Sequence, residues 1–284
     1  MTAAEQGLLL LCCPLEDGMT PLTAAQYRRL RELVREHRTE EDGSRELTGS
    51  DLAAIGCSPR ECEQILCLLG RQQALQAAMA RWQHWGIDIC TRLSPDYPKL
   101  LKTRLGDDAP AVLFLLGDRR ILRMEGISLV GSRQLRPEGE AFAAAAGKMA
   151  ARNGHVLISG NARGADQTAQ KACLQAGGCV MAFVADRLTK QIPQNRALYV
   201  SEESPEQAFS ALRALRRNRL IHAAGLETYV AQVTEGSGGT WSGTLRNLQA
   251  GWSPVYVHAD GSSGAKMLAE RGAAPITLQA LTEE

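Results

Sequence analysis

Aromatic residues are scarce in this chain, which also lacks a large excess of charge and any long apolar run. Phe, Trp and Tyr make up 5% of its 284 residues, so we do not expect a long platform for stacked nucleic-acid bases. The net charge of +1 creates no global field, so a nucleic-acid partner would have to be met by a local basic patch. The run Leu8–Cys13 is too short to span a bilayer and follows no Lys or Arg, so we expect neither a signal peptide nor a membrane partner.

Motifs of catalysis and cofactor binding are missing as well. The chain has neither the P-loop of ATP-binding proteins nor the G-x-G-x-x-G fingerprint of NAD-binding proteins in its expected place. No Ser–His–Asp or Cys–His grouping has a recognisable spacing, and Cys57, Cys62 and Cys67 recur every five residues, which is not a zinc-ligand spacing. We therefore expect a protein that is not an enzyme, that holds no cofactor or metal, and that keeps its thiols reduced in the cytoplasm.

Residues 1–85 show helical patterns. Thr20-Pro21 and Thr23–Gln26 offer an N-cap, a first-turn proline and a capping box, and Ser58–Glu61 is a strong helix start. The charged segment Arg38–Gly49 between them predicts a loop. Two short helices joined at Ile55–Cys57 resemble a helix-hairpin-helix, but the turn has no adjacent Lys, which favours a plain helical packing module.

From Gly86 onward, short apolar runs alternate with helix-length segments. This alternation is typical of an α/β fold, in which right-handed crossovers build a parallel sheet with helices on both faces. In such sheets ligands bind beyond the carboxyl ends of the strands, so the residues after each run are the candidate site. The predicted strands are Ile87–Cys90, Ala111–Leu116, Ile127–Val130, Val156–Ile158, Val180–Val184, Tyr229–Val233 and Val255–Val257.

Three of these runs are followed by glycine or serine, and two of the three by arginine. The segments are Gly131–Arg133, Ser159–Asp166 and Gly236–Thr240, and the last two each lead into a helix. Glycine lets the backbone approach an anion, the first N–H groups of a helix attract it, and arginine adds forked donors. We expect the three segments to form one crevice for a phosphodiester or nucleotide phosphate, although Asp166 could simply cap its helix.

Four arginines within seven residues form a further basic feature: Arg213, Arg216, Arg217 and Arg219. Such a run is usually a solvated helix face, but in a nearly neutral protein it also predicts a concentrated patch for phosphates. Phe209, Tyr199 and Trp241 are the few candidates for stacking on an unpaired base.

The chain resembles the DNA-processing protein A (DprA/Smf) family. The motifs run in the family's order across roughly residues 95–275. They are Tyr97–Leu101; Pro110 with Val112–Phe114 and Gly117-Asp118; Val130–Arg133; Ile158–Asp166; Pro193-x-Asn195-x-x-Leu198; Ser201-Glu202; Arg217–Ile221; Ser237–Thr240; and Gly264-x-x-x-Leu268 with Gly272-Ala273.

The resemblance implies an extended Rossmann-like parallel-sheet domain at residues 86–284, preceded by a small SAM-like helical domain at residues 1–85. Members of the family bind single-stranded DNA in a positive pocket, dimerise, and help to load a RecA-type recombinase during natural transformation. The resemblance also implies that arginine side chains contact the DNA phosphates and that the backbone approaches those phosphates closely at glycine and serine residues. The predicted DNA-binding residues are Gly131, Ser132, Arg133, Ser159, Gly160, Arg163, Gly164, Asp166, Arg217, Asn218, Arg219, Ser237, Gly238, Gly239 and Thr240.

Two other functions remain open from the residues. One is a sensor for a nucleotide-derived ligand that uses the same pocket. The other is an enzyme like the Rossmann phosphoribohydrolases, whose P-G-G-x-G-T-x-x-E loop ends in a catalytic Glu. Gly238–Gly243 contains no Glu, which makes the enzyme the weakest of the three hypotheses.

Overall fold

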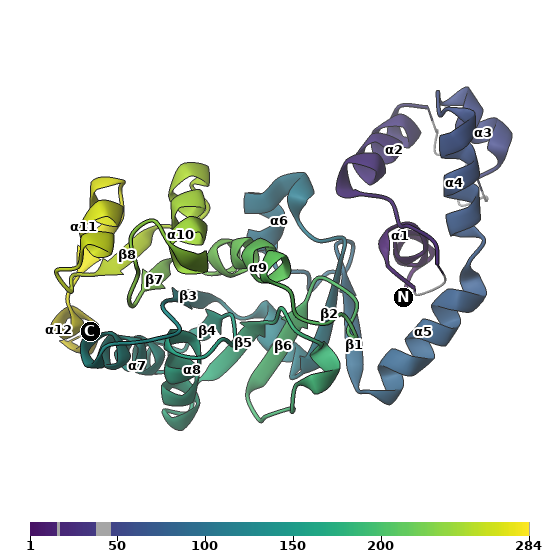
Figure 1. Ribbon diagram of the computed structural model, residues 1–284. Coiled ribbons are helices and arrows are strands. Elements are labelled where there is room, and N and C mark those ends of the chain that lie inside the picture. Colours follow the sequence, from purple (N-terminus) through teal and green to yellow (C-terminus); the bar gives the residue numbers. More distant parts are fainter. Residues whose placement is uncertain (16–17, 38–46, 284) are drawn as a thin grey trace. The chain divides into compact units, whose positions relative to one another are not determined.

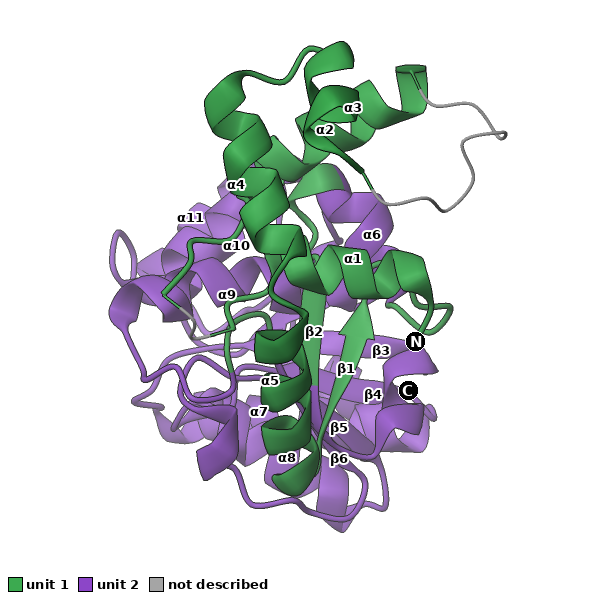
Figure 2. Ribbon diagram, turned by 90° about the vertical axis from the view of Figure 1, so that its right-hand side faces the viewer, with its two compact units in different colours: residues 1–97, 107–114, 202–204 green, residues 98–106, 115–201, 205–284 purple. Residues whose placement is uncertain are grey.

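The computed structural model describes residues 1–15, 18–37 and 47–283. The chain divides into two compact units (Figure 2). Unit 1 comprises Met1–Tyr97, Asp107–Phe114 and Glu202–Ser204, and unit 2 comprises Pro98–Gly106, Leu115–Ser201 and Pro205–Glu284. The domain boundary expected after residue 85 stays a prediction. In the described part of the chain, every helix is too short or too polar to cross a membrane.

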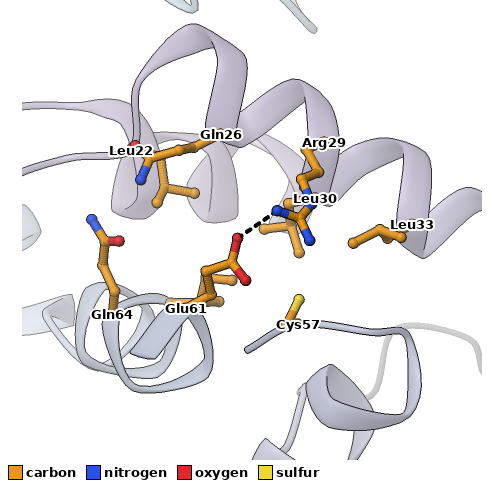
Figure 3. A pocket seen from close by; sticks show the side chains of 9 residues that line it. Leu22, Gln26, Arg29, Leu30, Leu33, Cys57, Glu61 and Gln64 are labelled. Atoms are coloured by element: carbon orange, nitrogen blue, oxygen red, sulfur yellow. Dashed lines mark hydrogen bonds and ion pairs between the residues drawn. The ribbon is translucent and has the colours of Figure 1, made fainter. Parts of the chain in front are cut away.

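Unit 1 is mainly helical, as predicted for the N-terminal part of the chain. Leucine and isoleucine side chains from four of its helices, among them Leu30, Leu52 and Leu68, form a buried core. A cavity of about 20 Å³ beside this core, lined by Arg29 and Glu61 among others, is too small for an organic ligand (Figure 3). The elements are α1 (Ala3–Cys12), α2 (Ala24–His37), α3 (Gly49–Ala54), α4 (Pro59–Leu69), α5 (Gln72–His84) and β1 (Ile87–Thr91).

The predicted helix starts of unit 1 are confirmed, with one shift. Ser58 and Glu61 form a reciprocal capping box at the start of α4. Thr23 and Gln26 pair in the same way before α2, so Pro21 precedes the helix and is not in its first turn. Of the loop predicted at Arg38–Gly49, residues 38–46 lie outside the described residues, and Gly49 already begins α3.

Unit 2 is built on a parallel sheet with helices on both faces, which confirms the predicted fold class. Paired strands run in the order β6-β5-β4-β3-β7-β8-β9, and each of these pairs is parallel. Figure 1 shows α7 and α8 on one side of the sheet and α9 and α10 on the other. The elements are α6 (Lys99–Leu105), η2 (Gly106–Asp108), β2 (Val112–Gly117), η3 (Arg119–Arg123), β3 (Gly126–Val130), α7 (Pro137–Arg152), β4 (Val156–Ser159), α8 (Ala165–Gln175), β5 (Cys179–Phe183), η4 (Leu188–Lys190), β6 (Ala197–Ser201), α9 (Ala211–Ala224), β7 (Thr228–Val230), α10 (Gly238–Ala250), β8 (Val255–His258), α11 (Ser263–Glu270), β9 (Ala274–Ile276) and α12 (Leu278–Glu283), where η2 and β2 each straddle the two units.

The central strands were predictable because parallel strands covered on both faces read as continuous apolar runs. All five residues of β3 are buried, and so are four of the five in β5. Two strands were missed: β6, in which four apolar residues lie between a turn and Ser201, and β9, which is largely exposed and contains Pro275. The strand predicted at Tyr229–Val233 ends at Val230, so the next three residues belong to the loop at the sheet edge.

Candidate functional site

A cavity of about 710 Å³ opens in unit 2 where the loops after β3 and β7 separate. The chain leaves β3 towards α7 on one face of the sheet and leaves β7 towards α10 on the other. A crevice at such a reversal is the usual ligand position in doubly wound sheets. A second cavity of about 670 Å³ shares Arg133, Ala162, Phe209 and Arg217 with the first.

Most of the predicted site residues line these two cavities, as the crevice hypothesis required. Ser159, Gly164 and Arg219 line neither cavity. The first cavity is lined by Gly131, Ser132, Arg133, Asp166, Arg217, Asn218, Ser237, Gly238, Gly239 and Thr240, and the second adds Gly160 and Arg163.

The loop after β3 is held in place by Gln232, a residue that the sequence did not single out. The Gln232 Oε1 accepts from the Arg136 N–H at 2.8 Å, and its Nε2 donates to the Gln134 carbonyl at 3.0 Å. The Ser132 N–H donates to the Gln232 carbonyl at 3.0 Å. Gly131 is required here because a Cβ would lie 2.5 Å from the Ala165 Cβ. No signal in the sequence pointed to this role, because Gln232 lies inside the strand predicted at Tyr229–Val233.

The start of α10 faces the first cavity without a cap. Its N-cap residue, Ser237, makes no side-chain hydrogen bond to the helix, so the first N–H groups keep their affinity for an anion. The Thr240 Oγ1 donates to the Gly131 carbonyl at 2.9 Å, and the Asn218 Nδ2 donates to the Gly239 carbonyl at 3.0 Å. These two bonds fix the helix start against the loop after β3.

The loop between β4 and α8 is already occupied by a carboxylate of the protein. The Asp166 Oδ2 accepts from the Gly160 N–H at 3.0 Å and from the Ala162 N–H at 3.1 Å. Burial raises the pKa of Asp166, and the positive charge of Arg217 opposes that rise. The predicted phosphate contacts at Gly160 and Asp166 need correction, because the N–H groups of this loop are bonded and the carboxylate beside them repels an anion.

Two of the four clustered arginines are buried, which corrects the predicted patch. Arg213 and Arg217 are each 7% exposed. The Arg217 Nη1 donates to the carbonyls of Gly160 and Phe183, at the ends of β4 and β5. A Cβ at Gly160 would overlap this guanidinium group, so the glycine accommodates Arg217. Arg217 therefore ties the two strand ends together.

Three other predicted contacts have structural explanations. Ser159 is fully buried, and its hydroxyl accepts from the Gln170 Nε2 at 2.6 Å. Gly164 has a φ of +81°, and a Cβ there would overlap the Ser132 carbonyl. The Arg219 Nη1 donates to the Arg216 carbonyl at 2.9 Å. None of the three is placed to bind a ligand in the cavities.

Arg133 and Arg163 are the exposed cations of the site. Arg133 lines both cavities and Arg163 lines the second, and neither forms an ion pair within the described residues. The Arg133 Cζ lies 6.0 Å from the centre of the Phe209 ring, which is half exposed and lines both cavities. Trp241 lines the first cavity, whereas Tyr199 is buried and cannot stack on a base.

The chain is similar in sequence to known proteins. The chain is 30% identical over 175 residues to DNA processing protein DprA of Bacillus subtilis (strain 168), an overlap of 58% of either chain. It is 29% identical over 195 residues to Protein Smf of Escherichia coli (strain K12), an overlap of 63% of this chain and 51% of the relative. The chain thus spans little more than half the length of these relatives.

Solved structures show the same fold. The DNA processing protein A of Streptococcus pneumoniae matches with a TM-score of 0.70 and 25% identity over 93% of each chain. The protein of the same name from Helicobacter pylori, for which a single-stranded DNA binding mode is described, matches with a TM-score of 0.59 and 22% identity over 70% of this chain and 95% of that one. Residues 88–283, more than half of the chain, match the model of one protein family. The chain therefore belongs to the DNA recombination-mediator protein A family.

Proposed function

We propose that this protein binds single-stranded DNA in the crevice formed by the two cavities and that it does so without catalysing a reaction. The observation that carries the proposal is the convergence of Arg133, Arg163 and the uncapped start of α10 at one edge of the sheet. These groups are donors for phosphate. The single-stranded DNA binding described for the Helicobacter pylori structure supports the same assignment.

The first cavity is lined by both polar and apolar groups. The loop after β3 and the start of α10 supply the polar groups, and a phosphate there would accept from Arg133 and from the helix N–H groups. The apolar lining residues include Phe209, Leu215 and Trp241. An unpaired base can stack on such rings, whereas the bases of a duplex are already stacked on one another. The cavity therefore favours a single strand over a duplex.

The biological setting is part of the proposal. Family membership supports a homodimer that helps to load a RecA-type recombinase onto DNA in the cytoplasm, in DNA uptake or recombination. Family membership also supports separate helical and Rossmann-like domains at residues 1–85 and 86–284.

Binding of a fluorescent oligo-dT over a salt series tests the site. We expect Arg133→Gln to weaken binding about tenfold or more and to lower the log–log salt slope by about 0.7, the value for one phosphate contact in a single strand. Arg120→Gln is the matched control, because that exposed residue pairs with Asp118 and lines neither cavity. Equal binding by the two variants would exclude the crevice as the DNA site, and a preference for duplex would exclude the stacking model.

A ligand sensor is the alternative that the cavity volume favours. About 710 Å³ lies within the range of small-molecule sites. Tight binding of a mononucleotide, without retention of oligo-dT, would support this alternative.

A further inference from the structure

Three arginines of unit 1 surround a single carboxylate. Arg28 and Arg31 lie on α2, Arg92 follows β1, and Asp107 belongs to η2. The Asp107 Oδ1 lies 3.2 Å from the Arg31 Nη2 and 3.6 Å from the Arg92 Nη2, and its Oδ2 lies 3.6 Å from the Arg28 Nη1. We call these four residues the Asp107 cluster.

The charge of the Asp107 cluster is not balanced. Three guanidinium groups and one carboxylate leave a charge of +3 − 1 = +2, in a chain whose whole net charge is +1. The side chains of Arg28 and Arg31 are 45% and 48% exposed, so this charge faces water. One carboxylate cannot accept from all the donors of three guanidinium groups, and the remaining donors suit a further anion.

Neighbouring residues extend the cluster along one side of α2. Arg28, Arg31 and Arg35 recur at intervals of three and four residues, which places them on one helix face, and Arg35 is exposed. α2 has four arginines and no lysine. Arginine is preferred over lysine for phosphate because its planar fork matches two phosphate oxygens.

A tyrosine precedes Arg28 on the same helix. Tyr27 is partly buried against the core of unit 1. Burial raises the pKa of its phenol, and the positive charges of Arg31 and Arg92 act in the opposite direction.

We propose that the Asp107 cluster is a second contact surface for the phosphates of single-stranded DNA, in addition to the crevice of unit 2. This inference rests on the proposed function, since it assumes that the partner is the same strand. An acidic polypeptide is the competing partner for such a surface.

The experiment measures binding of the full chain to oligo-dT of about 30 nucleotides, longer than the roughly 4–16 that one compact site covers. We expect Arg28→Gln/Arg31→Gln to lower the salt slope by about 1.4, the value for two phosphate contacts. The matched control is Arg29→Gln on the same helix, because Arg29 is engaged with Glu61 at 3.0 Å (Figure 3). This control should bind like the parent.

A second variant gives an effect of opposite sign. Asp107→Asn removes the only carboxylate of the cluster and leaves its arginines, so we expect tighter binding and a steeper salt slope. A purely structural ion cluster would instead lose stability without any gain in affinity, and that result would overturn the inference.

Arg133→Gln separates this inference from the proposed function. If Arg133→Gln weakens binding while Arg28→Gln/Arg31→Gln binds like the parent, the second surface is wrong and the crevice stands. The reverse result would support the second surface and remove the crevice. Displacement of oligo-dT by polyglutamate as readily as by unlabelled oligo-dT of equal charge would assign the cluster to acidic polypeptides and overturn the inference.

Discussion

Two glycine-rich loops of unit 2 precede helices and yet differ in what their N–H groups bind. In the loop between β4 and α8, N–H groups of Gly160 and Ala162 donate to Asp166. In the loop between β7 and α10, the helix start carries no side-chain cap and faces the cavity. The second residue of each helix makes the difference, because it is Asp166 in α8 and Gly239 in α10. A glycine loop therefore permits an anion, and the residues of the helix decide whether the protein supplies that anion itself.

The support beneath the two loops differs as well. We call the loop between β4 and α8 the closed loop and the loop between β7 and α10 the open loop. Arg217 donates to the carbonyls at the strand ends next to the closed loop. The α10 residue Asn247 belongs to an uncharged network. Its Nδ2 donates to the Ser253 Oγ and lies 3.3 Å from the Nδ1 of His222, which is fully buried. The closed loop thus lies beside a buried charge, whereas α10, the helix that follows the open loop, packs against a neutral histidine.

Removing the charge beneath the closed loop should have the largest effect. Arg217→Ala leaves the Gly160 and Phe183 carbonyls and the nearby Asp166 without a buried cation, and we expect a loss of about 3–5 kcal/mol in the free energy of unfolding. Urea unfolding measures this loss. Arg216→Ala, an exposed arginine of the same helix, should change it by no more than about 0.5 kcal/mol. Similar losses for the two variants would refute the structural role of Arg217.

A fall in pH should destabilise the packing of α10, the helix after the open loop, against His222. Burial lowers the pKa of His222 from 6.5 to about 4. Because the folded state disfavours the charged imidazole, the stability due to this shift is present above pH 6.5 and is lost as the pH falls through about 4. This pKa shift corresponds to about 3 kcal/mol in the free energy of unfolding.

Unfolding by urea between pH 7.5 and 4.5 tests the role of His222. The parent should lose stability across this range, and His222→Gln should show a flatter dependence. Hydrogen-exchange protection, taken relative to the intrinsic exchange rate at each pH, should fall more in α10 than in α8 at pH 4.5. An equal loss of protection in both helices would show that the two supports do not differ in the way described.

A methyl group should disturb the closed loop more than the open one. A Cβ at Gly160 would displace the buried Arg217 guanidinium, so we expect Gly160→Ala to cost about 1–3 kcal/mol. At Gly239 the nearest atom to a Cβ is the Asn218 Nδ2 at 3.1 Å, and alanine favours the helix by up to about 1 kcal/mol. Gly239→Ala should therefore be close to neutral. A greater loss of thermal stability in Gly239→Ala would reverse the comparison.

The sequence predicted where the two cavities lie better than which groups are available in them. Apolar runs located the central strands, and the rule that ligands bind at the carboxyl ends of parallel strands located the crevice. Whether a hydrogen-bond donor of the cavities is free or already bonded within the protein depends on the rotation of its helix about the helix axis, which the sequence pattern did not settle. Arg213 and Arg217 share the face of α9 that carries the buried Leu220 and Ile221, a spacing of three and four residues that already indicated burial.

Other features of the site could not be predicted from spacing. Asp166 could be expected either to cap its helix or to line a phosphate site, and only the position of its Oδ2 between two N–H groups decided the matter. Gln232 acquires its role because β7 ends at Val230, three residues earlier than the apolar run suggests. Strand ends depend on tertiary contacts, which a run of Val and Ala does not reveal.

The last prediction converts the open loop into a closed one. Gly239→Asp places a carboxylate at the second position of α10, which Asp166 occupies in α8. The negative charge near the helix start should offset the strain of the new side chain, so the free energy of unfolding should change by less than about 1 kcal/mol. Oligo-dT binding should nevertheless fall about tenfold below that of Gly239→Ala, because the protein then supplies its own anion where a phosphate would bind. Gly239→Asn is the uncharged control, which separates charge from volume. If Gly239→Asp and Gly239→Asn bind oligo-dT equally well, phosphate does not bind at the start of α10, and the contrast between the two loops has no bearing on DNA.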